Sequence, residues 1–231
     1  MKWDMPLQEG ILLNRYKRFL ADVILDEKTH VAHVPNTGSM TSCWAPEWKC
    51  ALSLSNNPKR KLAHTLELTH NGESWIGVNT GNANKLVYEW LQNRILPPFA
   101  QYSTITPEKK VLDSRIDFYL EGENLPSCFI EVKSVTLKKD GMAQFPDAVS
   151  TRGQKHLRDL IEIKRSGLRA AMVYVVQRED VEEMRPAHSI DPQYGKFLKE
   201  AVLAGVEIFV YQCRIDLNEI KFGRPLAFNL E

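Results

Sequence analysis

Two acidic residues and a lysine near the middle of the chain could hold a metal ion beside a phosphate. Asp117 lies in a run that alternates polar and apolar residues over 114–121, and Glu131 and Lys133 lie in a strand-like run over 128–135. Side chains repeat every second residue along a strand, so Glu131 and Lys133 should point to the same side. If the two runs pair as a hairpin, Asp117 should lie beside Glu131. The pattern predicts a site with two carboxylates and one ammonium group.

That set of groups suits the metal-dependent hydrolysis of a phosphodiester bond. Mg²⁺ takes oxygen ligands and keeps several waters, so one or two carboxylates can hold it. A bound metal neutralises charge on a phosphate oxygen and lowers the pKa of a bound water. The Lys133 ammonium could orient the attacking water or pair with the phosphate. The other interpretation is that these three groups form an ordinary solvated strand face.

The surroundings of the Glu-x-Lys triplet carry more information than the triplet itself. The sequence contains five such triplets, which begin at Glu47, Glu108, Glu131, Glu162 and Glu219. The Glu131 triplet lies in an apolar strand-like run, after a turn-rich segment and an aspartate-bearing strand. In that first strand, Ile116, Phe118 and Leu120 are expected to share one face, and Arg115, Asp117 and Tyr119 the other.

Several longer segments of the sequence, spread in order over nearly the whole chain, can be compared with known families. They are Arg-Tyr-Lys-Arg-Phe-Leu-Ala-Asp-Val from Arg15, Pro-Asn-Thr-Gly from Pro35, Lys-Arg-Lys from Lys59, Ser-Arg-Ile-Asp-Phe from Ser114, Phe-Ile-Glu-Val-Lys-Ser-Val-Thr-Leu from Phe129, and Phe-Pro-Asp-Ala-Val-Ser-Thr-Arg-Gly-Gln-Lys-His-Leu from Phe145. Together they resemble the sugar fermentation stimulation protein family. The spacing from Asp117 to Glu131-Val132-Lys133 also resembles the core of the PD-(D/E)XK nuclease superfamily.

The resemblance implies a fold and a function. The fold would be α/β with a mixed sheet: an OB-like β-barrel over residues 1–80 that binds nucleic acid, then a PD-(D/E)XK nuclease-like domain over 81–231. The family is described as binding DNA without sequence specificity and as influencing sugar (maltose) use. Two functions therefore stay open, namely DNA binding with a regulatory role, and Mg²⁺-dependent nuclease activity. A small-molecule-binding regulator has no sugar-site pattern to support it.

The superfamily also implies roles for individual residues. Asp117 and Glu131 would be ligands of Mg²⁺ or Mn²⁺, and the Val132 carbonyl would be a third. Lys133 would assist the attacking water. Ile116 stands where the superfamily has a proline before the aspartate, which weakens the motif without removing a ligand.

Two helices could add residues to this site. Glu89, on the helix expected over 82–94, could join the metal ligands, or it could be an exposed helical glutamate. On the helix expected over 151–166, which Thr151 is expected to cap, Gln154 and Lys155 would steady the scissile phosphate or the catalytic lysine. The resemblance to the superfamily implies these roles.

Three groups of residues are candidates for contact with DNA. They are Arg15, Tyr16, Lys17 and Arg18; Lys59, Arg60 and Lys61; and Arg152 with Lys155. The net charge is only +1, so contact has to come from such local clusters. Phosphate contacts do not read bases, and a tyrosine ring can stack on any base, so binding should be independent of sequence. We expect the DNA to be double-stranded. Each cluster also fits an ordinary solvated turn, and residues 36–39 fit a tight loop better than a phosphate-binding turn.

The pattern of elements supports a barrel followed by a mixed sheet. Short β-like runs broken by turns fill about 10–78. Apolar runs at 170–176 and 206–213 flank a helix expected over 193–204, which favours a partly parallel sheet. The run 216–222 is expected to be an edge strand.

Composition excludes several classes of protein. Hydrophobic residues make up 43% of the chain, which is enough for a buried core. No apolar run approaches the roughly eighteen residues of a membrane span, and the N-terminus lacks a signal-peptide pattern, so we expect a cytoplasmic protein without membrane contact. The four cysteines form no Cys-x-x-Cys pair, which favours buried reduced thiols over zinc or disulfides.

Overall fold

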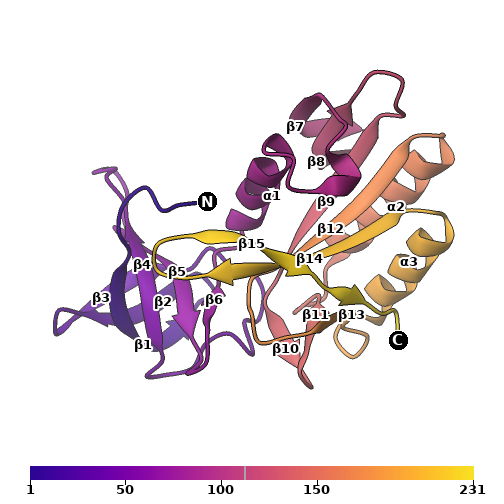
Figure 1. Ribbon diagram of the computed structural model, residues 1–231. Coiled ribbons are helices and arrows are strands. Elements are labelled where there is room, and N and C mark those ends of the chain that lie inside the picture. Colours follow the sequence, from indigo (N-terminus) through magenta and orange to yellow (C-terminus); the bar gives the residue numbers. More distant parts are fainter. Residues whose placement is uncertain (112) are drawn as a thin grey trace.

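The computed structural model describes residues 1–111 and 113–231, and the first third of the chain forms a β-barrel (Figure 1). Its strands are β1 (Gln8–Tyr16), β2 (Leu20–Leu25), β3 (Lys28–His33), β4 (Lys49–Leu54), β5 (His64–His70) and β6 (Trp75–Gly77). The strand order is β3-β2-β1-β4-β5-β6, and a parallel pairing of β3 with β5 closes the first five strands into a barrel. This closure confirms the expected OB-like architecture.

Alternation along the strands explains the core of the barrel. In β2, Ala21, Val23 and Leu25 point inward while their neighbours are partly exposed. The turn between β2 and β3 places Asp26 and Glu27 at positive φ, 46° and 63°. That conformation matches the tight turns that join twisted antiparallel strands.

A six-stranded mixed sheet follows the barrel. Its order is β15 (Ile220–Pro225), β14 (Glu207–Ile215), β12 (Arg169–Val176), β9 (Cys128–Val135), β8 (Ser114–Glu121) and β7 (Thr104–Val111). The central strands β9, β12 and β14 are parallel, β15 and β8 pair antiparallel to β14 and β9, and β7 pairs antiparallel to β8. The mixed sheet confirms the expected α/β class for this part of the chain.

Helices cover both faces of this sheet (Figure 1). Helix α1 (Asn82–Gln92) buries Trp90 and its neighbours against one face, and a short 3-10 turn, η1 (Pro97–Phe99), follows it. Helices α2 (Thr151–Arg165) and α3 (Pro192–Leu203) pack on the opposite face. A small sheet beside them has the order β10 (Leu137–Lys139), β11 (Met142–Phe145), β13 (Glu183–Pro186) and β16 (Ala227–Phe228). In the described parts of the chain, no helix is long and apolar enough to cross a membrane.

Three expectations about local structure were wrong. Ile116 packs in the apolar cluster under α2 and α3, whereas Phe118 and Leu120 pack in the cluster under α1, so these three do not share a face. The pairing of β8 with β9 ends between them, at Asp117, whose side chain accepts the backbone N–H of Val132. The run 216–222 begins with a turn in which Asp216 accepts two backbone N–H groups, and the edge strand starts only at Ile220. Ser150, rather than Thr151, caps α2 by accepting the N–H of Gly153.

A buried polar cluster joins the barrel to the sheet. Arg178 is only 2% exposed and donates to the carbonyls of Ser42 (3.1 Å) and Thr136 (2.7 Å). Asp180 accepts from Arg178, from Lys138 at 2.8 Å and from Asn71 of the barrel at 3.0 Å. We call Lys138, Arg178 and Asp180 the joint cluster. Nearby, the N–H of Gly77 in β6 donates to the carbonyl of Gln177 at 2.9 Å.

Candidate metal and nucleic-acid site

Asp117 interrupts the ladder between β8 and β9. Regular pairs run from Leu120 with Cys128 to Phe118 with Ile130. One step further, a carboxylate oxygen of Asp117 accepts the backbone N–H of Val132 at 2.8 Å. Its other oxygen accepts the amide of Asn84, in the first turn of α1, at 2.7 Å. The carboxylate is therefore fixed between the two strands and the helix.

Glu131 is 2% exposed and has one oxygen with two partners and one with none. Its Oε1 accepts from the Lys133 ammonium at 2.5 Å and from the His156 ring. Its Oε2 is buried and has no partner among the described residues. A buried carboxylate oxygen without a partner costs free energy, so native proteins rarely leave one in place without a reason. This oxygen is therefore available to accept from a water or to contact a cation.

The electrostatics of the two acids differ. Burial raises the pKa of Asp117, and the neighbouring Glu131 carboxylate raises it further. Burial alone would also raise the pKa of Glu131, but Lys133 and His156 outweigh it and hold this pKa below its ordinary value. Repulsion between the two carboxylates therefore disfavours ionisation of Asp117, and a positive charge near Asp117 would reduce that repulsion.

His156 holds Glu131 from the side of α2. The Arg152 guanidinium donates from Nε to His156 Nε2 at 3.4 Å. On the other side of the ring, Nδ1 faces Oε1 of Glu131, a carboxylate oxygen that accepts the ring proton. The sequence analysis did not select His156. The available signal was its place in the buried stripe of α2 beside Leu157 and Leu160, where a polar ring needs a polar partner.

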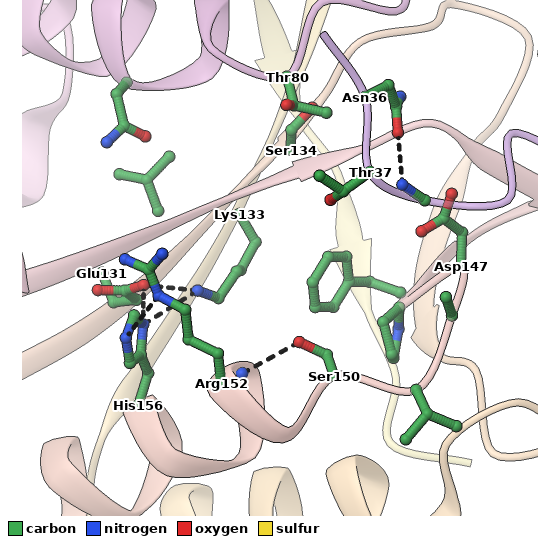
Figure 2. A pocket seen from close by; sticks show the side chains of 18 of the residues that line it. Asn36, Thr37, Thr80, Glu131, Lys133, Ser134, Asp147, Ser150, Arg152 and His156 are labelled. Carbon is green, nitrogen blue, oxygen red and sulfur yellow. Dashed lines mark hydrogen bonds and ion pairs between the residues drawn. The ribbon is translucent and has the colours of Figure 1, made fainter. Parts of the chain in front are cut away.

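These residues line a cleft of about 480 Å³ between the barrel and the sheet. Figure 2 shows Glu131, Lys133 and His156 on one side, and Asn36, Thr37 and Asp147 on the other. The barrel contributes Arg18 and residues 36–38; the start of α1 contributes Thr80 and Asn84; β8 and β9 contribute Asp117 and residues 131–134; and residues 145–150 lead into α2, which adds Arg152, Gly153 and His156. We call this space the cleft.

The barrel loop at residues 36–39 forms the wall of the cleft opposite Glu131. Arg15 braces it by donating to the carbonyls of Asn36 (3.1 Å), Gly38 (3.0 Å) and Ser39 (3.0 Å). At Gly38, a Cβ atom would lie 2.0 Å from a carboxylate oxygen of Asp147, so only glycine permits this approach. The loop expected from the sequence therefore lies at the site.

Three residues predicted for the site lie elsewhere. Glu89 is 42% exposed and pairs with the N-terminal ammonium at 2.8 Å, and Asn84 of the same helix reaches Asp117 instead. Gln154 donates to Asp191, the residue that caps α3. Lys155 bonds to Ser114 and Asp159.

The predicted DNA contacts divide into free and engaged groups. Arg18 and Arg152 line the cleft. Arg15 braces the barrel loop, Tyr16 donates its hydroxyl to Asp22 at 3.1 Å, and Arg60 donates to Thr65 at 2.6 Å. The remaining cations of these clusters, Lys17, Lys59 and Lys61, are exposed.

Oxygen atoms dominate the possible metal donors. Across residues 1–111 and 113–231, no group of three or more His, Cys, Asp or Glu side chains gathers around one point. Asp117 and Glu131 supply two carboxylates, and any further donor has to be a carbonyl or water. Such a set suits a hard cation that keeps several waters better than it suits zinc.

Comparisons with known proteins cover almost the whole chain. Residues 13–78 match the family described as SfsA N-terminal OB domain, and residues 81–219 match the one described as sugar fermentation stimulation protein RE domain. A sugar fermentation stimulation protein homolog from Shewanella baltica (strain OS185) is 49% identical over 228 residues, 97% of each chain. One from Geobacter sulfurreducens is 49% identical over 223 residues, 96% of this chain and 95% of its own. The structure of Pyrococcus furiosus SfsA in complex with Ca²⁺ is similar, with a TM-score of 0.91 and 28% identity over 99% of this chain and 98% of that one.

Proposed function

The chain belongs to the sugar fermentation stimulation protein family, and from that premise we propose that it binds nucleic acid and hydrolyses its phosphodiester bonds with a divalent metal. One observation carries the proposal: the buried Oε2 of Glu131 has no partner among the described residues, and the neighbouring Asp117 has a raised pKa. A cation near the two carboxylates would give Oε2 a partner and would reduce the repulsion that raises the pKa of Asp117.

The donor atoms fit Mg²⁺ or Mn²⁺. Asp117 and Glu131 would each give a carboxylate oxygen, and the Val132 carbonyl would be a third donor. The description of the Pyrococcus furiosus protein includes Ca²⁺, which also prefers oxygen ligands. When bound, the metal would neutralise charge that develops on the phosphate in the transition state.

The other side chains of the cleft would position the phosphate and the attacking water. Lys133 pairs with Glu131, and its ammonium would orient the water or pair with the phosphate. His156 holds the other side of Glu131. Arg152 and the N-terminus of α2, which both border the cleft, offer donors to an anionic oxygen.

Binding would rest on phosphate contacts that do not read sequence. Arg18 and Arg152 line the cleft, and Lys59 and Lys61 are exposed on the barrel. We propose that these cations bind DNA outside or at the edge of the cleft, and that double-stranded DNA serves because it offers phosphates on both strands. Affinity should therefore fall steeply with salt and vary little with base sequence.

DNA binding without cleavage is the second candidate function, with a regulatory role in the use of sugars such as maltose. The observation in its favour is that Lys133 and His156 already balance the charge of Glu131 in the absence of metal. A protein that only binds DNA could retain this arrangement for stability.

A cleavage assay separates the two functions. Purified protein is incubated with DNA and RNA substrates in Mg²⁺ or Mn²⁺, beside Asp117→Ala and a control, Glu123→Ala, at an exposed turn outside the cleft. Metal-dependent cleavage by wild type and Glu123→Ala, lost in Asp117→Ala, is expected. Cleavage by all three proteins would place the reaction at another site or in a contaminant. No cleavage by any of them would leave DNA binding as the activity.

A further inference from the structure

The cleft is closed on one side because its two walls touch. The barrel loop at 36–40 and the segment that leads into α2 meet at Asp147, which accepts the N–H of Met40 at 3.2 Å. Gly38 lies so close to the same carboxylate that a Cβ would not fit between them. Glu131 and Lys133 therefore lie in a space with a continuous wall, rather than on an open sheet surface.

The walls are also held at a fixed separation. Arg15 ties the barrel loop by three bonds to backbone carbonyls. Behind it, Arg178 and Asp180 of the joint cluster bind residues of both the barrel and the sheet. Opening the cleft would break the partly buried bonds from Arg178 to the Ser42 carbonyl and from Asn71 to the Asp180 carboxylate, each of which involves a charged group.

The space inside these walls is small. At about 480 Å³ the cleft lies in the range of roughly 300–1,000 Å³ that is usual for pockets that bind single small molecules. A B-form duplex has a major groove about 12 Å wide between its own two strands, so the whole duplex is much larger than such a space. One or two nucleotides of a single strand would fit.

We propose that the cleft admits a single strand of nucleic acid and excludes an intact duplex. The inference rests on the proposed function, and it names the form of the substrate that reaches Asp117 and Glu131. A duplex bound at the basic clusters outside would have to present an unpaired end, a gap or a displaced nucleotide, as enzymes that act inside a pocket generally require.

Val149 supplies an independent observation for an unpaired base. It belongs to the segment that leads into α2, lines the cleft and is 67% exposed. A ligand that covered this side chain would remove apolar surface from water, which is favourable. Apolar side chains that face nucleic acid commonly pack against unstacked bases, whereas the bases inside a duplex are already stacked.

A cysteine at this position would report which form enters the cleft. The four native cysteines are all buried, so Val149→Cys gives one exposed thiol in the cleft. Its rate of alkylation is measured without metal, with single strands of about 16 nucleotides and with blunt duplexes of the same sequence. Leu203→Cys is the control, because Leu203 is 79% exposed at the end of α3 and lies outside the cleft.

The single strand should slow alkylation of Val149→Cys about tenfold at saturation, which is the effect of a contact worth one stacked base. The blunt duplex should leave the rate unchanged even when it is bound, and Leu203→Cys should react equally in every case. Equal protection by the duplex, or none by the single strand, would overturn the inference.

The failure of this inference differs from failure of the proposed function. Protection by the duplex together with metal-dependent cleavage would leave the nuclease in place and remove strand selection. Protection by the single strand without cleavage in Mg²⁺ or Mn²⁺ would support the cleft as a strand-binding site and remove hydrolysis.

Discussion

The molecule contains two buried clusters of charge that differ in how completely they are paired. In the joint cluster, both oxygens of Asp180 have donors, from Arg178, Lys138 and Asn71. Burial opposes the charge of Asp180, yet these partners hold its pKa well below the ordinary value. In the cleft, Glu131 keeps a buried oxygen without a partner in the described chain, and Asp117 has a raised pKa.

The difference separates structural from functional use of buried charge. A buried ion pair stabilises a fold only when each of its atoms finds a partner, because desolvation otherwise exceeds the attraction. The joint cluster meets that condition and connects two parts of the chain. The cleft does not meet it, so its residues should contribute little to stability and much to binding and chemistry. The predictions below test that assignment.

The largest effect is expected in the joint cluster. Arg178→Met should destabilise the protein by about 3–5 kcal/mol, because it leaves buried carbonyls of Ser42 and Thr136 without their donor and weakens the pairing of Asp180. Denaturant unfolding measures the change. Arg165→Met is the matched control, since Arg165 pairs with Glu162 at the surface, and it should change stability little. Similar losses of stability in both variants would show that the buried joint cluster stabilises the fold no more than a surface ion pair does.

Lys133→Met should have the opposite effects, with stability largely kept and activity lost. Methionine keeps much of the length and the apolar stem of lysine, so the variant should fold and still bind DNA. Any metal-dependent cleavage should fall about a hundredfold or more, because the ammonium can no longer meet the water or the phosphate. Lys110→Met, on the exposed part of β7, serves as the control in the same assay. Full cleavage by Lys133→Met would remove the catalytic role of this lysine.

Asp117→Asn should stabilise the metal-free protein, because it removes a like charge beside Glu131. Asn84 can turn its amide to satisfy the new side chain. The variant should also lose the rise in unfolding temperature that Mn²⁺ gives the wild type. A less stable variant, or one that still gains stability from Mn²⁺, would contradict a metal site at Asp117.

The smallest expected effect is in the pH dependence of stability. Because the pKa of Asp117 is raised in the folded protein, protonation of Asp117 stabilises the fold at acid pH. This stabilisation is lost as pH rises through that pKa. The advantage of Asp117→Asn over wild type should therefore shrink as pH falls from about 7 to 4. Asp180 has a lowered pKa, so its stabilisation should be present at neutral pH and fade on acidification. That stabilisation should be lost as pH falls below about 4 toward the lowered pKa, so unfolding of Asp180→Asn between about pH 5 and 2 checks the opposite sign.

Local patterns in the sequence were sufficient for the hairpin that carries the site. Alternation over 114–121 and the apolar run over 128–135 predicted β8 and β9, and the turn residues between them predicted their antiparallel pairing. Alternation could not show that Ile116 packs in a different cluster from Phe118 and Leu120, because that depends on how the helices pack on the two faces of the sheet. The family resemblance supplied the barrel closure, which is confirmed.

Contacts between distant segments explain the remaining differences. No local pattern relates Gly38 to Asp147, so the loop at 36–39 could be read as a turn but not as a wall of the cleft. Glu89 lies on the expected helix, but its carboxylate pairs with the N-terminal ammonium, a partner that is distant in sequence. His156 could be assigned to the site only once α2 was known to lie over Glu131, and the packing of α2 on the sheet provides that information.

The joint cluster also limits how this architecture can evolve. A barrel and a nuclease-like sheet suggest two modules that could be inherited or exchanged separately. Here Ser42 and Asn71 of the barrel bond to Arg178 and Asp180 of the sheet, and Gly77 of the barrel bonds separately to Gln177. A transplanted barrel would have to carry matching partners with it. Change on either side of the joint is therefore constrained by the other, and the two halves should diverge together.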